Sequence, residues 1–187
     1  MRKLIGSVVL VTLGAMLPAL AAAQRRAAPE AGPQHELGVD LAFNYVSVGS
    51  GGGSGVRLAA PVDVRIGFLS RSQNMFEGRV SLLWDSNSGF VAFSPGVNIL
   101  HQLKRGTGTH GLMRATYVTG GVGLNITKAG SGASTATQFV LNGGLGKRLP
   151  YESAVFCPEA FIAYAFKTST VPSEFSIGVR LGLSFWH

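Results

Sequence analysis

From residue 35 onward, apolar residues alternate with polar or small ones in short runs along the chain. The last run, 174–187, shows this pattern most clearly. One of its faces carries Phe175, Ile177, Val179, Leu181, Leu183 and Phe185. The other carries Ser176, Gly178, Arg180, Gly182 and Ser184. Because successive side chains of an extended strand point to opposite faces, this period of two predicts β-structure.

Eight such runs are separated by clusters of glycine, serine, threonine and proline, which is the pattern of an all-β domain. They cover residues 36–48, 56–68, 76–85, 91–99, 112–126, 139–146, 156–166 and 174–187. The fifth run is the least regular, because Arg114 and Tyr117 break its alternation, and we expect a β-bulge near Gly120 and Gly121. No segment with helical periodicity competes with these runs.

Three prolines lie inside or beside the runs, where each removes a hydrogen-bond donor from a strand ladder. They are Pro61, Pro95 and Pro158. We expect them to mark bulges or strand starts.

The face opposite the apolar one is made mostly of small residues. Its members include Gly38, Ala42, Ala59, Gly67, Ala92, Gly96, Gly144, Gly146, Ala163, Gly178 and Gly182. A strand surface facing water favours Lys, Glu, Thr and Gln, whereas the bore of an eight-stranded barrel is only just wide enough for side chains. The pattern therefore favours an eight-stranded antiparallel up-and-down transmembrane β-barrel with its apolar face toward lipid. A soluble barrel or sandwich with the faces inverted is the alternative.

Nine charged residues, five basic and four acidic, also fall on the small face. They are Asp40, Arg57, Asp63, Arg65, Glu77, Arg79, Arg148, Glu159 and Arg180. Buried charges are costly unless they are paired, so a lumen location predicts a ladder of ion pairs, whereas a soluble domain would carry nine unrelated surface charges. Glu159 and Arg180 lie on neighbouring runs and are the pair that we expect most directly.

The first residues have the features of a secretory signal peptide: a basic start, an apolar stretch and small residues at Ala21–Ala23. We expect residues 1–23 to be cleaved, residues 24–34 to form a flexible leader and residues 35–187 to form the barrel domain; a retained membrane anchor is the alternative. Without Arg2 and Lys3 the chain has fourteen basic and nine acidic residues, a charge of +5. The basic residues are scattered, which argues against nucleic-acid binding.

Four segments carry a resemblance to a known family. They are "YVTGGVGLNI" (117–126), "FVLNGGLGKRLP" (139–150), "EAFIAYAF" (159–166) and the final alternating run. Together with the signal peptide, these segments resemble the small bacterial outer-membrane β-barrel proteins, the OmpA/OmpX/OmpW-like superfamily, over residues 35–187. The resemblance implies an outer membrane of the Gram-negative type, contact with its lipid, and assembly by the barrel-insertion machinery.

The final strand departs slightly from this family. The insertion machinery reads that strand in family members, where it usually ends in phenylalanine or tryptophan. Here Phe185 and Trp186 precede a last residue, His187.

Some barrels of this kind are enzymes, such as lipid A acylases and deacylases. A hydrolase needs a nucleophile, a base and an orienting acid within reach of one another. The four histidines, His35, His101, His110 and His187, lie in no such motif and are too dispersed to indicate a metal site. The loop "GSGGGSG" (49–55) lacks the lysine and helix of a phosphate-binding loop. Cys157, the only cysteine, excludes an internal disulfide and is interpreted as a small lumen residue. We expect no catalytic residue, cofactor or metal.

Two functions are consistent with this pattern, and a third follows from the inverted faces. A continuous charged ladder favours a structural or envelope-related barrel, because it leaves no apolar cavity in the bore. A gap in the ladder near the loop end, around Phe90 and Ala92, would favour a barrel that binds or transports a small apolar molecule. A soluble exported lipocalin-like binding protein is the third. The ligand, if there is one, is unknown.

Overall fold

The computed structural model describes residues 35–49, 52–70, 74–86, 88–103, 114–130 and 132–186, without the side chains of residues 57–62. The expected signal peptide and leader, at 1–23 and 24–34, lie outside the described residues and stay predictions. Across the described ranges, no helix is long and apolar enough to cross a lipid bilayer.

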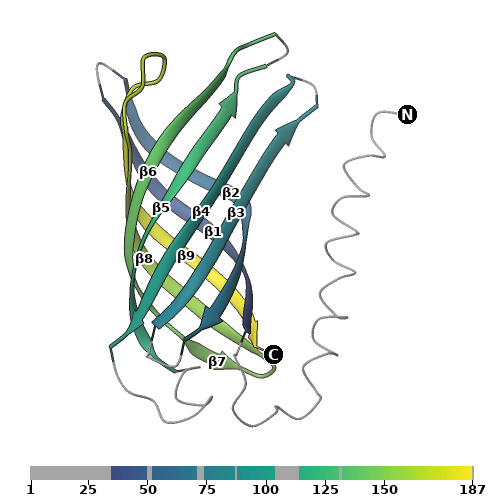
Figure 1. Ribbon diagram of the computed structural model, residues 1–187, viewed down its shortest axis with the longest axis vertical. Helices are drawn as coiled ribbons and strands as arrows, with labels where there is room; N and C mark the ends of the chain where they lie inside the picture. Colours follow the sequence, from purple (N-terminus) through teal and green to yellow (C-terminus); the bar gives the residue numbers. More distant parts are fainter. Residues whose placement is uncertain are drawn as a thin grey trace.

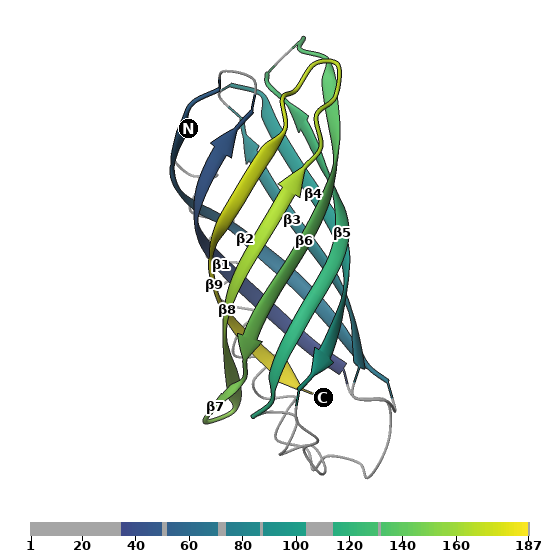
Figure 2. The ribbon, with the colours of Figure 1, turned by 90° about the vertical axis from the view of Figure 1, so that its left-hand side faces the viewer.

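The described residues form a closed antiparallel barrel (Figures 1 and 2). Its eight long strands are β1 (His35–Val48), β2 (Ser54–Leu69), β3 (Asn74–Asp85), β4 (Phe90–Gln102), β5 (Thr116–Lys128), β6 (Thr135–Lys147), β8 (Ala154–Ala165) and β9 (Glu174–Trp186). A short strand, β7 (Leu149–Tyr151), pairs only with the start of β8. The sheet closes because β1 pairs with β9 and β6 pairs with β8. The predicted all-β, eight-stranded antiparallel up-and-down barrel is confirmed.

The prediction of a β-bulge in the fifth strand is wrong. β5 keeps one constant register with β4 and with β6, through Gly120 and Gly121. Tyr117 is buried and Val118 is exposed, so the alternation of β5 is intact. Tyr117 breaks the expected pattern only because it is a large ring on the inner face. Arg114 precedes the strand.

The register irregularity lies instead between β1 and β2. It falls between Asp40 and Ala42 of β1, opposite residues 60–62 of β2, which include a proline. The other two prolines also lie where strand pairing is interrupted. Pro95 falls in a gap of the β4–β5 ladder, and Pro158 lies between the parts of β8 that pair with β6 and with β7. A missing backbone donor costs least at such positions.

The barrel has two distinct ends. β1 begins and β9 ends at the same end, beside β7 (Figures 1 and 2). We call this the terminal end. The opposite end, which we call the loop end, carries the connections between β3 and β4, β5 and β6, and β8 and β9.

The outer surface of the barrel is apolar on all eight long strands. On β9 the exposed residues are Phe175, Ile177, Val179, Leu181 and Leu183, and the residues between them are buried or half-buried. Val97 of β4 is 62% exposed and Leu82 of β3 is 61% exposed. The apolar face that the alternation identified is therefore the outer face, and the small face lines the bore.

Candidate functional site: an ion-pair network in the lumen

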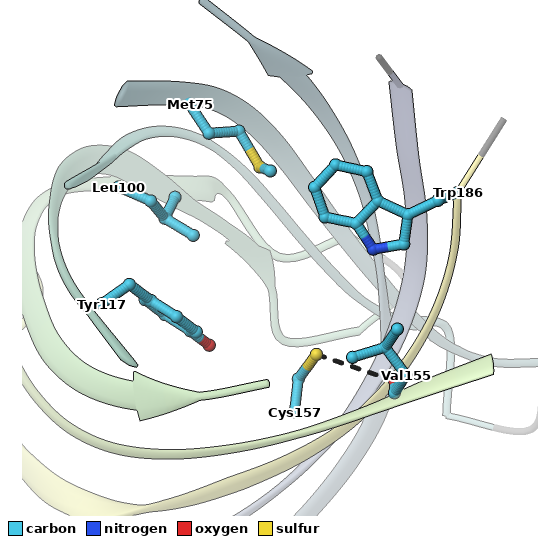
Figure 3. Packing of buried hydrophobic residues seen from close by; sticks show 6 residues of the cluster. All are labelled: Met75, Leu100, Tyr117, Val155, Cys157 and Trp186. Atoms are coloured by element: carbon cyan, nitrogen blue, oxygen red, sulfur yellow. Dashed lines mark hydrogen bonds between the residues drawn. The ribbon is translucent and has the colours of Figure 1, made fainter. Parts of the chain in front are cut away.

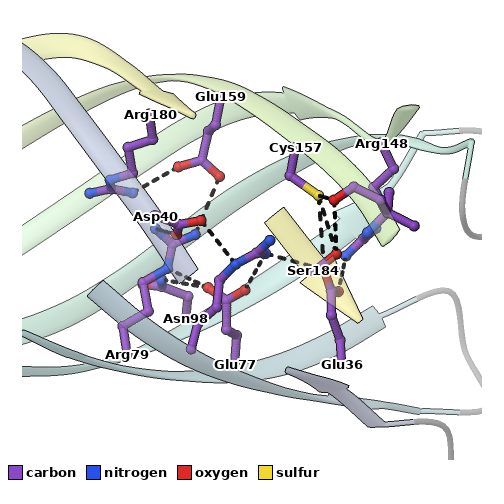
Figure 4. Close-up of polar contacts among 12 residues, drawn as sticks. Glu36, Asp40, Glu77, Arg79, Asn98, Arg148, Cys157, Glu159, Arg180 and Ser184 are labelled. Atoms are coloured by element: carbon purple, nitrogen blue, oxygen red, sulfur yellow. Dashed lines mark hydrogen bonds and ion pairs between the residues drawn. The ribbon is translucent and has the colours of Figure 1, made fainter. Parts of the chain in front are cut away.

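Charged side chains from six places on the barrel meet inside the bore (Figure 4). Among the described side chains, Arg65, Arg79, Arg148 and Arg180 form ion pairs with Glu36, Asp40, Glu77 and Glu159. All eight side chains are at most 13% exposed. The pairs share members, so they link into one network that runs along the bore.

Arg65 of β2 is the centre of this network. Its guanidinium lies 3.3 Å from Glu36 Oε1, 3.1 Å from Asp40 Oδ1 and 3.2 Å from Glu77 Oε2. The side chain is 1% exposed. One guanidinium thus compensates three carboxylates, two from β1 and one from β3.

Arg79 and Arg180 extend the network across the bore toward the loop end. Arg79 of β3 pairs with Glu77 through Nε, lies 3.4 Å from Asp40 through Nη1, and lies 3.4 Å from Glu159 of β8 through Nη2. Arg180 Nη1 of β9 lies 2.7 Å from the other oxygen of Glu159. Its guanidinium also stacks over Phe161, 4.1 Å from the ring centroid.

The terminal end of the bore is filled by apolar packing around Arg148, which lies between β6 and β7. Arg148 Nη2 is 2.8 Å from Glu36 Oε2. Its guanidinium lies over the rings of Tyr117 and Trp186, at 4.8 and 5.3 Å from their centroids. These rings belong to a buried cluster that comprises Met75, Leu100, Tyr117, Val155, Cys157 and Trp186 (Figure 3). The bore is therefore filled first by this cluster and then by the ion-pair network.

Strand register places a glycine directly beside most of the large inward side chains. Gly38 is opposite Arg65, Gly96 is opposite Arg79, and Gly146 is opposite Tyr117. A Cβ added to Gly38 would lie 2.8 Å from Arg65 Cγ. A bore this narrow has room for a long side chain only where its cross-strand neighbour has none. The small residues of the inner face thus leave the room that the large inward side chains need.

Two of the nine sequence-predicted charges differ from the rest. Asp63 is half-buried, and no Lys or Arg among the described side chains lies within ion-pair distance of it. The side chain of Arg57 lies outside those described. The other seven, Asp40, Arg65, Glu77, Arg79, Arg148, Glu159 and Arg180, all take part in the network.

Sequence reasoning missed one member of the network, Glu36. It is fully buried and pairs with both Arg65 and Arg148. The alternation of the strand indicates this position, because Glu36 lies two residues before Gly38 and therefore points to the same face. Glu36 links the other ion pairs to Arg148, whose guanidinium lies against the buried cluster.

A cavity lies between the ion-pair network and the loop end of the bore. It has a volume of about 210 Å³. Its lining includes Asp63, Arg79 and Arg180, together with several asparagines and serines. Phe90 and Ala92, where a gap in the ladder was considered, are half-buried and not part of this lining.

The histidines and Cys157 form no centre with these groups. His35 packs edge-on against Phe68, and His101 Nδ1 lies 2.8 Å from Asn74 Oδ1 on the outer surface. His110 and His187 lie outside the described residues. Cys157 is buried, with Sγ 3.5 Å from Ser184 Oγ. In the ranges that the structure describes, no group of three or more His, Cys, Asp or Glu is arranged to hold a metal.

Removing the carboxylate of Glu159 is expected to destabilise the barrel. Glu159→Ala leaves Arg180 without its ion-pair partner and takes one of three acids from Arg79. We expect the unfolding temperature in detergent to fall by several degrees, at about 2–4 °C for each kcal/mol lost. Glu159→Gln, which keeps the shape of the side chain, serves as the control for lost packing and should also lower this temperature. An unchanged temperature in both variants would contradict a stabilising role for these pairs.

The comparisons with known proteins identify the fold. No protein-family model matches the chain, and no curated protein matches it. Among solved structures, the chain is similar to Neisserial surface protein A (NspA), with 15% identity and a TM-score of 0.54 over 81% of this chain and 96% of that one. It also matches the N-terminal β-barrel domain of Pseudomonas aeruginosa OprF, with 12% identity and a TM-score of 0.48, over 82% of this chain and 100% of that one. A third match is Ail of Yersinia pestis, with 11% identity and a TM-score of 0.45, over 84% of this chain and 100% of that one. The resemblance to small outer-membrane barrels is confirmed at the level of the fold.

Proposed function

We propose that this protein lies in the outer membrane of a Gram-negative type of envelope, as a barrel with a plugged lumen and a structural or envelope-related role. One observation supports this most strongly. On every long strand the apolar side chains are exposed on the outside, while eight charged side chains inside the bore, each at most 13% exposed, are paired with one another.

The outer surface suits lipid and not water. Exposing apolar surface to water costs about 25 cal/mol for each Å², and a monomer in water seldom carries an apolar patch above a few hundred Å². The long strands have 12–16 residues, more than the roughly 9–11 that cross a hydrocarbon core. Exposed aromatic side chains lie toward both ends of the strands, with Trp84 and Tyr45 near the loop end and Phe68 and Tyr151 near the terminal end. This is the distribution that membrane interfaces favour.

The contents of the bore favour a structural role over transport. The buried cluster around Tyr117 and Trp186 and the ion-pair network lie one behind the other along the bore. Opening a path would separate buried charges, each costing several kcal/mol. The cavity beyond them is lined by charged, amide and hydroxyl groups, which suits a small apolar ligand poorly. A soluble lipocalin-like protein would bury the apolar face that is exposed here.

Cell fractionation followed by gel electrophoresis with and without boiling tests the location and the fold in a membrane. We expect the protein in the outer-membrane fraction, with the unboiled sample migrating faster because a closed barrel stays compact in detergent. Recovery in the periplasm or the medium would contradict the proposed location.

Reconstitution into planar bilayers tests the plugged lumen separately. We expect no steady ion conductance from the inserted barrel. Steady conductance from protein that also shows the heat-dependent gel shift would overturn the plugged lumen and leave the membrane location intact.

A further inference from the structure

The cavity in the loop half of the bore is the part of the lumen that neither the ion-pair network nor the buried cluster of the terminal end fills. At about 210 Å³ it has room for about seven water molecules, at roughly 30 Å³ each. Arg79 and Arg180 form its floor on the side of the network. Its walls come from all eight long strands, whose backbone hydrogen bonds hold its shape.

The wall of this cavity offers hydrogen bonds of both kinds. It contains four carboxamides, from Asn44, Asn98, Asn125 and Asn142, and three serine hydroxyls. Asn44 is 8% exposed, and its Oδ1 is buried with no hydrogen-bond donor among the described residues. A buried polar group without a partner is costly, so this oxygen favours a polar occupant.

The charges around the cavity favour an uncharged occupant. Both arginines of the floor already have carboxylate partners, at Glu159 for Arg180 and at three acids for Arg79. The interaction of Asp63 with the hydroxyl of Ser81 occupies part of its carboxylate. A strongly charged ligand would have to compete with these contacts, whereas hydroxyl groups both donate to and accept from carboxamides, carboxylates and guanidinium groups.

From this lining we propose that the loop-half cavity is a binding site for a small, uncharged, polyhydroxylated molecule of about the size of a monosaccharide. This site goes beyond the proposed structural role. It rests on that proposal only for the side from which the ligand arrives, which would be the cell exterior. Binding itself depends on the closed barrel, which exists in detergent micelles as well as in a membrane.

Ala163 offers a direct way to fill the cavity without removing a polar group. It is an inward, half-buried residue of β8 that lines the cavity, paired with Asn142 on one side and Ser176 on the other. Ile162, its chain neighbour, points outward and is 52% exposed. Phenylalanine at 163 would occupy the cavity, while phenylalanine at 162 would add the same ring to the lipid-facing surface. Ile162→Phe is therefore the matched control for Ala163→Phe.

Equilibrium dialysis of the folded protein in detergent against radiolabelled D-glucose, D-galactose, D-mannose and myo-inositol tests the site. We expect saturable one-to-one binding of at least one probe, with a Kd of about 1 mM or tighter. Ala163→Phe should weaken this binding by at least about tenfold and Ile162→Phe by less than about twofold. The gel shift without boiling shows that each variant is folded.

Absence of saturable binding for all four probes would overturn the proposal, and so would binding that Ala163→Phe leaves unchanged. If Ala163→Phe does not fold, Asn142→Leu replaces it, because leucine keeps the volume of the side chain and removes its hydrogen bonds. That variant must weaken binding for the proposal to stand. Because these measurements are made in detergent, their failure would leave the membrane location untouched, and a failed fractionation test would leave the site untouched.

Discussion

Replacing Arg65 by methionine is expected to destabilise the folded barrel by about 3–5 kcal/mol, the range for breaking a buried ion pair by removing one partner. Arg65 is 1% exposed and lies within 3.3 Å of three carboxylates, those of Glu36, Asp40 and Glu77. Methionine fills much of the same space but compensates none of these charges. Glu36 would still form its ion pair with Arg148. Asp40 and Glu77 would each be left with one ion-pair partner, Arg79. Unfolding by urea in detergent, followed through loss of the fast-migrating gel band, measures the change.

Arg180→Met is the matched control for this prediction. Arg180 forms an ion pair with Glu159 alone among the described residues, and its side chain, at 13% exposed, lies at the edge of the cavity. The loss of stability should therefore be clearly smaller than for Arg65→Met. Equal losses in the two variants would show that the number of carboxylates around a lumen arginine does not decide its contribution.

The alternation of residue types was sufficient to predict which face of each strand points into the bore. Arg180 and Glu159 were assigned to one face from the period of two alone, and they lie 2.7 Å apart. The same rule, applied one step further, would have included Glu36. It would also have placed Tyr117 inside, because its neighbour Val118 points outward. The error at Tyr117 came from expecting no large ring on a face made mostly of small residues.

The partners within the network could not be predicted, because they depend on strand register. Arg65 is directly opposite Arg79, and Asp40 is directly opposite Asp63. Like charges at directly opposite positions repel, so the favourable contacts of Arg65 run diagonally, to residues two positions away from its direct partners. The register shift opposite residues 60–62 sets which residues of β1 and β2 meet, and a single sequence does not reveal it.

The position of the loop-half cavity could not be predicted by counting the charges of the inner face. Five basic and four acidic residues on one face predict that charges pair, but not how far along the bore the pairs extend. Within the described residues, Arg180 and Glu159 are the last ion pair of the network before the cavity. Asp63 lies beyond them, against Ser81. Where paired charges give way to amides and hydroxyls, the bore changes from a plug to a cavity, and only the three-dimensional arrangement locates that change.

Replacing Gly178 by alanine is expected to impair closure of the barrel, at or above the upper end of the roughly 1–3 kcal/mol that overpacking costs. Gly178 of β9 is directly opposite Asn44 of β1. A Cβ at this position would run into the backbone carbonyl oxygen of Phe43 and would lie 2.6 Å from the Cα of Asn44. These are backbone atoms of the paired strand, so they cannot move aside as a flexible side chain can. Relief requires β1 and β9 to separate at the seam that joins the first strand of the barrel to the last.

Refolding in detergent, scored by the fraction of protein in the fast unboiled band, measures this effect, and Gly120→Ala is the matched control. Gly120 of β5 points outward, and a Cβ there would meet no atom within 4 Å. Since glycine inside a strand is less stable than alanine by roughly 0.5–1 kcal/mol, Gly120→Ala should fold at least as well as the unmodified chain. The two substitutions add the same methyl group to a central strand position, so a difference between them isolates the crowding at the β1–β9 seam. Equal folding of both variants would mean that the seam relaxes without loss and that closure tolerates a wider spacing between β1 and β9.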